Sequence, residues 1–153
     1  ISTRLRRQAY LDAMGRKNLE VRPEWYRLAD ADYSFASGQA AARALLAVEP
    51  RPTAIFCTSD ILALSVISAA QELGLEVPGG LTVTGFDDVD YTTMVHPHLT
   101  TVAQPCHEMG LRSVDLLLAG LQKEKPASSE RTFLPHCLMK RESSAPPQST
   151  KTN

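Results

Sequence analysis

Two short polar segments follow apolar runs that are typical of buried strands. Residues 58–60 (Thr-Ser-Asp) come directly after the run 53–57, and Asp87 and Asp88 follow the run 81–85. Hydroxyl and carboxylate oxygens of this kind can hydrogen-bond the O–H and N–H groups of a small polar ligand. Ligands of open α/β sheets bind at the carboxyl ends of the strands, where helix N-termini also converge. The spacing therefore predicts a ligand crevice at these two strand ends.

The segment between the two runs supplies the element that positions them. Residues 61–73 have helical spacing, and Gly74 is a typical stop signal. A strand, a helix and a second strand in this order form a βαβ unit with parallel strands. The fold class predicted is therefore α/β, with a Rossmann-like parallel sheet and flanking helices.

Further elements are indicated on both sides of this unit. Ser2 can cap a helix that stops at Gly15, with Leu5, Ala9, Tyr10 and Ala13 on the side that we expect to lie on a sheet. The patterns also predict a short strand at 25–29, a polar loop at 30–34, a helix at 35–48, an extended segment at 102–105, a helix at 106–121 and a strand at 132–140.

Composition excludes several classes of protein. The chain has 153 residues, 43% of them hydrophobic, and its formal net charge is −1. No apolar run approaches the roughly 20 residues of a membrane span, and the charge gives no strong field for nucleic acid. We expect no membrane association and no specific DNA binding by this chain alone. No signal peptide follows Ile1, and the missing initiator Met suggests a fragment.

Cysteine and histidine side chains are the other candidates for chemistry. Cys57, Cys106 and Cys137 are odd in number and widely separated, so we expect no disulfide framework and a reducing, cytoplasmic location. No histidine activates a cysteine nucleophile, and neither a GxGxxG motif nor a P-loop is present, so no cofactor is predicted. His96 and His98 lack a third ligand at recognisable spacing, and the intervening proline is expected to aim the imidazoles apart. No metal is predicted.

These pieces together resemble the effector-binding region of the lactose-repressor/galactose-repressor (LacI/GalR) family of bacterial transcription factors, from about Ser2 to Ser143. Ala9 departs from the usual Gly, Ser59 stands where Asn is common, and Gly79-Gly80 replace an acidic pair. The resemblance is carried by 6–14, by 52–56 with 59–60 and 63–64, by 74–78 leading to 85–88, and by 99–102 with 104–105 and 108–110.

The resemblance implies a division of the chain. Residues 1–104 would form the C-terminal effector-binding subdomain of a periplasmic-binding-protein-like fold. Residues 105–125 would form a helix that normally packs on an N-terminal subdomain not included here, and 126–142 a return strand. Residues 143–153 lack large apolar groups and are expected to be a disordered tail. The family's DNA-binding headpiece is also outside this sequence, so operator DNA would be reached only through it.

Effector-binding residues follow partly from position and partly from the resemblance. Arg6 lies in the first turns of a helix near the crevice, where its guanidinium can bind two ligand oxygens, and Asp87 can accept hydrogen bonds there. Ser2 and Tyr33 match positions that approach the effector in the family, and Ser59 is a further candidate. Asp60 and Asp88 are expected to cap a helix and a turn instead.

Association is predicted from the helix at 61–73, which is apolar nearly all round. One face can cover the sheet, and the other is expected to form a subunit contact. Leu64, Ile67 and Val95 match the two-fold dimer contact of the family. The helix at 106–121 adds apolar side chains without a subdomain to pack on. A homodimer or a swapped assembly is expected.

The leading hypothesis is thus the effector-sensing and dimerisation part of a bacterial transcriptional regulator, binding a sugar or sugar derivative and performing no catalysis. The alternative is a periplasmic sugar-binding protein of a transport system. A third hypothesis, a flavodoxin-like or hydrolytic enzyme using Asp87 and Asp88, is disfavoured because adjacent carboxylates on a strand point to opposite faces.

Overall fold

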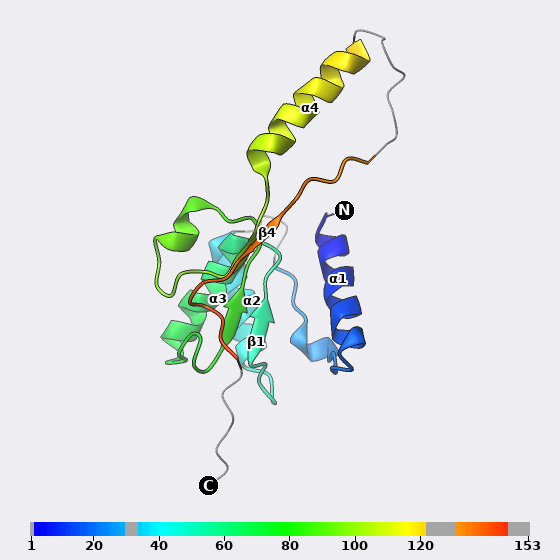
Figure 1. Cartoon of the computed structure of the whole chain (residues 1–153). Helices are drawn as coiled ribbons and strands as arrows, with labels where there is room; N and C mark the ends of the chain where they lie inside the picture. The colour runs from blue at the N-terminus through cyan, green and yellow to red at the C-terminus, as the bar shows by residue number, and fades with distance from the viewer. Residues whose placement is uncertain (1, 30–33, 122–130, 147–153) are drawn as a thin grey trace.

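The computed structural model describes residues 2–29, 34–121 and 131–146. The elements alternate between helices and strands, which confirms the predicted α/β class (Figure 1). They are α1 (Ser2–Arg16), η1 (Pro23–Trp25), α2 (Phe35–Leu46), β1 (Ala54–Phe56), α3 (Asp60–Glu72), β2 (Thr82–Thr84), η2 (Asp90–Thr93), β3 (Thr101–Ala103), α4 (Cys106–Leu121) and β4 (Cys137–Met139), where η denotes a 3-10 helix.

The strands place their carboxyl ends at one edge. β1 and β2 are parallel, with Ile55 opposite Val83. Parallel bridges from Thr84 to Thr100 and from Asp87 to Ala103 set the β3 segment beside β2. β4 pairs antiparallel with β3. The ends of β1, β2 and β3 therefore meet where the sequence predicts a ligand crevice.

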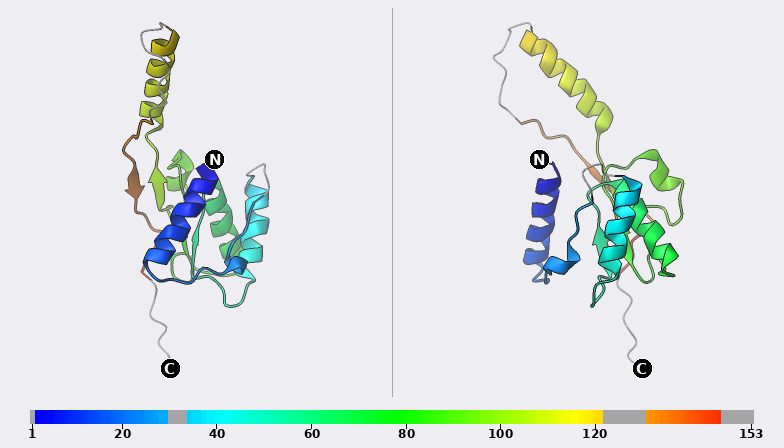
Figure 2. Two further views of the ribbon diagram at one scale, coloured as in Figure 1. Left: turned by 90° about the vertical axis from the view of Figure 1, so that its right-hand side faces the viewer. Right: turned by 180° about the vertical axis from the view of Figure 1, so that it is seen from behind.

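The hydrophobic core lies between the β1–β2 pair and the helices α2 and α3, which lie side by side (Figure 2). α2 approaches closely because Gly38 has no side chain: a Cβ there would meet the Ser65 hydroxyl at 2.5 Å. The buried apolar residues are Ala42, Leu45, Leu46, Ile55, Cys57, Ala63, Val66, Ile67, Ala69, Ala70, Leu81, Val83 and Leu99.

This packing corrects the prediction for α3. The second apolar face was expected to form a subunit contact, but α2 covers it. Ile67 is only 4% exposed and belongs to the core of its own chain, so it is not available for the dimer contact that the resemblance implied. Leu64 and Val95 remain half-buried and can still contribute to such a contact.

α1 lies on the other face of β1, in an orientation that differs from the prediction. Leu5 is 59% exposed, and Ala9 and Ala13 are also exposed. Of the four expected contacts only Tyr10 remains, stacked on Phe56 with 6.3 Å between ring centroids. Arg6, one turn before Tyr10, also faces the strands, where it contacts Thr58 and Phe86.

The strand predicted at 25–29 is absent. Pro23 begins the 3-10 turn η1, and Tyr26 has extended dihedral angles but no ladder partner. The segment at Tyr26 does not pair with β1, although the two lie close together. Tyr26 and Phe56 both line a mainly apolar groove of about 170 Å³. An extended backbone without a hydrogen-bonded neighbour does not form a strand.

The disordered tail was predicted to begin at residue 143, but residue 143 is still part of the folded structure. Ser143 is completely buried, and its backbone N–H donates to His98 O (3.0 Å) while its carbonyl accepts from Val83 N (2.9 Å). Its hydroxyl donates to Val83 O (2.7 Å) and accepts from Thr100 N (2.8 Å). Four hydrogen bonds thus bind a small polar residue into the sheet, which apolar content alone does not predict. Residues 147–153 lie outside the described residues.

α4 has the predicted extent and projects away from the rest of the chain (Figure 1). None of its residues is buried. No helix among the described residues is long and apolar enough to cross a membrane. The exposed large hydrophobic side chains of α4 are Met109, Leu111, Val114, Leu116, Leu117, Leu118 and Leu121.

Candidate functional site

Arg6 extends from the first turns of α1 to the carboxyl ends of β1 and β2. Its Nη1 donates a hydrogen bond to the carbonyl of Thr58, directly after β1. Its guanidinium carbon lies 3.8 Å from the centroid of the Phe86 ring, a cation–π contact. Its Nη2 lies 3.7 Å from Asp87 Oδ1, and the Arg6 side chain is 20% exposed. The charge is thus fixed at the carboxyl ends of the strands and partly accessible.

Asp87 supplies the opposite charge in an unusual backbone conformation. Its φ is 126°, which is disfavoured for a residue with a Cβ and typically costs about 1–3 kcal/mol. Its N–H donates to Val102 O (3.0 Å), and its Oδ1 accepts from Gln104 Nε2. Burial raises the pKa of the Asp87 carboxyl, while the charge of Arg6 and the Gln104 hydrogen bond lower it. Strain of this kind is found most often at functional sites.

Ser59 occupies the N-cap position of α3, but its hydroxyl forms no cap hydrogen bond. Ser59 Oγ is shielded from solvent and has no hydrogen-bond partner within residues 2–29, 34–121 and 131–146. A buried hydroxyl without a partner costs about 1–3 kcal/mol. A ligand hydroxyl or N–H group that reached this oxygen would remove that cost.

Two neighbouring carboxylates hold the crevice together instead of capping helices. Asp60 is 1% exposed, and it accepts from Val89 N (3.1 Å) and Thr101 Oγ1 (2.6 Å), so the predicted helix cap is wrong. Asp88 does accept from Thr92 Oγ1 in the following turn (3.4 Å), but its shorter contact is with Arg141 Nη2 (2.6 Å). Both groups link segments that are distant in sequence.

Asp87 and Asp88 form no acid/base pair, although not for the predicted reason. Both follow β2 in a turn with positive φ, of 126° and 59°, and their carboxylates bind different partners. Cys57 is equally unsuited to nucleophilic chemistry. It is buried, and burial together with the nearby charge of Asp60 raises the pKa of its thiol to about 12.

The structure brings together three of the five predicted effector residues, namely Arg6 and Asp87 in direct contact and Ser59 beside Thr58 at the end of β1. Tyr33 lies outside the described residues, and the side chain of Ser2 is likewise not described. Two site residues were missed by sequence reasoning, Phe86 and Gln104. Gln104 follows Ala103, which bridges to Asp87, so knowledge of that pairing would have revealed it.

Comparison with known proteins agrees with this arrangement. The family model described as "Periplasmic binding protein-like domain" matches residues 2–144. The class of protein is therefore a periplasmic-binding-protein-like α/β domain. Within that class, the chain belongs to the LacI family of transcriptional regulators, as the following relatives show.

The HTH-type transcriptional repressor CytR of Escherichia coli K12 is 40% identical over 126 residues, covering 82% of this chain and 36% of the repressor. Catabolite control protein A of Priestia megaterium is 39% identical over 136 residues, covering 89% of this chain and 40% of that protein. The chain thus spans about two fifths of the length of these curated relatives. Their repressor functions favour the regulator hypothesis over a periplasmic transport protein.

Solved structures give the same result. The transcriptional regulator CelR in complex with cellobiose superposes with a TM-score of 0.84 at 31% identity, covering 91% of this chain and 42% of that chain. A LacI family transcriptional regulator from Lactobacillus casei with bound sucrose gives a TM-score of 0.72 at 30% identity, covering 90% and 50%. Both are similar proteins with a disaccharide bound.

Proposed function

We propose that this chain is the effector-sensing part of a bacterial transcriptional regulator and that it binds a sugar or sugar derivative through Arg6, Ser59 and Asp87. The observation that carries the proposal is the Ser59 hydroxyl after β1, which has no hydrogen-bond partner in the described part of the chain. It accompanies an Arg6–Asp87 pair whose acidic member has a strained backbone. Ser2 and Tyr33 stay predictions as further effector contacts.

The chemistry of these groups suits a polyol. Each sugar hydroxyl both donates and accepts hydrogen bonds, Arg6 only donates, the Asp87 carboxylate only accepts, and Ser59 does both. A hydrogen bond to a charged group contributes about 1.5–3 kcal/mol net. Gln104 holds the Asp87 carboxylate in place before a ligand arrives, which reduces the entropy lost on binding.

The regulatory consequence rests on differential binding. An effector that binds one conformation of the complete protein more tightly than another shifts the population toward that conformation. Operator DNA would be bound by a headpiece outside this sequence, in a homodimer located in the cytoplasm. No catalytic step is required in this proposal, and the relatives reported above are regulators rather than enzymes.

The test is isothermal titration calorimetry on the complete product of the gene with a panel of mono- and disaccharides, nucleosides and sugar phosphates. We expect one class to bind and to change the affinity for DNA upstream of neighbouring genes in an anisotropy assay. Ser59→Ala should weaken that binding by about threefold to tenfold. Ser113→Ala, whose hydroxyl donates to Met109 O of its own helix, is the matched control and should bind as the parent does. Failure of every class to bind would overturn the proposal.

A further inference from the structure

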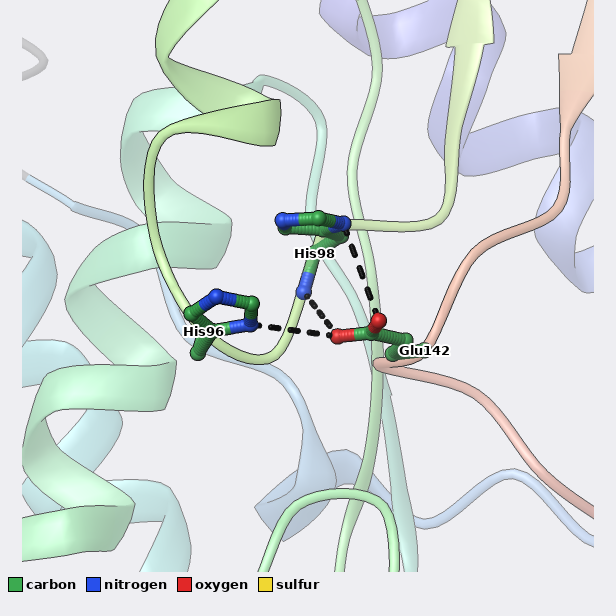
Figure 3. Close-up of side chains that lie close together, drawn as sticks. All are labelled: His96, His98 and Glu142. Atoms are coloured by element: carbon green, nitrogen blue, oxygen red, sulfur yellow. Dashed lines mark hydrogen bonds and ion pairs between the residues drawn. The ribbon is translucent and has the colours of Figure 1, made fainter.

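Two histidines and a glutamate converge at the opposite end of the parallel strands from the crevice (Figure 3). His96 Nδ1 lies 3.5 Å from Glu142 Oε2, and His98 Nδ1 lies 3.7 Å from Glu142 Oε1. The two imidazoles stack with centroids 4.6 Å apart. The prediction that the intervening proline aims the two rings apart is wrong, because the rings stack. No third ligand stands at a recognisable sequence spacing, but Glu142, distant in sequence, lies beside both rings.

The cluster is held by backbone contacts on both sides. Glu142 precedes Ser143, whose N–H donates to His98 O, and the His98 N–H returns a hydrogen bond to Glu142 Oε2 (3.0 Å). Gln71 of α3 donates to the carbonyl of His96 (3.3 Å). These contacts fix the backbone of both histidines and one oxygen of the Glu142 carboxylate, and hydrogen bonds to a ligating carboxylate orient it in metal sites.

The donor set and its spacing fit a divalent transition metal. One potential ligand atom from each residue lies within 4.8 Å of the others. Zinc bonds imidazole nitrogen and carboxylate oxygen at about 2.0–2.2 Å, so donors on a tetrahedron are about 3.4 Å apart. The 3.5 and 3.7 Å separations, which run to the two different oxygens of Glu142, are close to this value. The stacked imidazoles, whose planes differ by 23°, must rotate so that both nitrogen lone pairs point at one ion.

We propose that His96, His98 and Glu142 form a binding site for a divalent transition metal of the zinc class. Two imidazoles and one carboxylate select zinc, copper or nickel over magnesium and calcium, which take mainly oxygen ligands. The side chains of His96 and Glu142 are 80% and 55% exposed, so an ion can reach them and a fourth position stays open to water. This proposal is independent of the effector site.

Zinc itself is the probe for the test. Cys106 and Cys137 are exposed thiols and would bind zinc, so both are replaced by Ser in the background chain. Zinc is titrated against a chromophoric chelator, and cobalt is added to report tetrahedral coordination by its visible absorption. We expect one equivalent of zinc per chain and a higher Tm with zinc present.

Glu142→Gln and His98→Ala should each weaken zinc binding at least about tenfold and abolish the Tm shift. The remaining histidines, His107 and His136, provide the matched controls, and His107→Ala and His136→Ala should bind zinc as the background chain does. Circular dichroism of each variant without metal checks that it is folded. No zinc binding at millimolar concentration, or equal affinity in Glu142→Gln, would overturn the proposal.

Discussion

The two ends of the parallel strands are built in different ways. At the carboxyl end, Arg6 and Asp87 are mostly covered, and Asp87 has a disfavoured backbone conformation. At the amino end, His96 and Glu142 are exposed. The ends are joined by the segment from His98 to Ala103, which spans about 16 Å at a rise of about 3.3 Å per residue.

The difference shows two ways of positioning polar groups. The carboxyl end stores strain and leaves the Ser59 hydroxyl without a partner among the described residues, and a ligand can satisfy that hydroxyl. The amino end has ordinary backbone pairing, with Ser143 hydrogen-bonded on both sides. Variants that change one end of the strands without changing the other test this difference.

The largest effect is expected from Gly85→Ala at the carboxyl end. A Cβ at Gly85 would overlap the Asp60 carboxylate and meet the Leu99 side chain at 2.9 Å. Overpacking of this kind costs about 1–3 kcal/mol, measured as the free energy of unfolding in urea. Gly110→Ala is the matched control because a Cβ there has nothing within 4 Å, and it should not destabilise the chain. Equal effects of the two variants would contradict the close packing at Gly85.

A comparable effect is expected from Ser143→Ala at the amino end. The variant leaves Thr100 N–H and Val83 O without their buried partner, and unsatisfied buried groups of this kind cost about 1–3 kcal/mol. Urea denaturation measures the loss. Replacement of the exposed Ser113 serves as control, since its hydroxyl bonds only within α4. An unchanged free energy of unfolding in Ser143→Ala would mean that the segment at residue 143 is as loosely held as the sequence suggested.

The carboxyl end could be predicted from sequence because each of its residues follows a recognisable strand or opens a helix. Arg6, Ser59 and Asp87 were proposed from local patterns, from the order of the elements and from the resemblance to the LacI/GalR family. Glu142 could not be found in this way, because its partners His96 and His98 are 46 and 44 residues away. The return of the chain beside β3 decides that contact, and hydrophobic periodicity does not reveal which polar residue stands opposite a histidine.

Errors in the helices had a similar origin. The apolar faces of α3 were recognised, but the sequence did not indicate that α2 covers the second face through Gly38. The orientation of α1 was wrong because Arg6 was treated only as a ligand group, whereas its contact with Phe86 also orients the helix. Side chains that serve both structure and binding are the hardest to assign from one sequence.

The smallest stability effect is expected from Asp87→Asn. The folded state raises the pKa of Asp87, so its favourable contribution is present when it is protonated and is lost as the pH rises through the folded pKa. Asparagine cannot ionise, so the variant should be slightly more stable than the parent at neutral pH. Thermal denaturation should show this difference shrinking as the pH falls through the folded pKa and absent below about pH 4.

The most direct test of the central claim is the effector affinity of Arg6→Ala and Asp87→Asn in the complete gene product, measured by calorimetry with the sugar that binds the parent. Each variant should bind at least about tenfold more weakly, because each loses a charged hydrogen bond. Asp87→Asn should do so while being no less stable than the parent, which separates binding from folding. Unchanged affinity in both variants would contradict the assignment of the carboxyl end as the effector site.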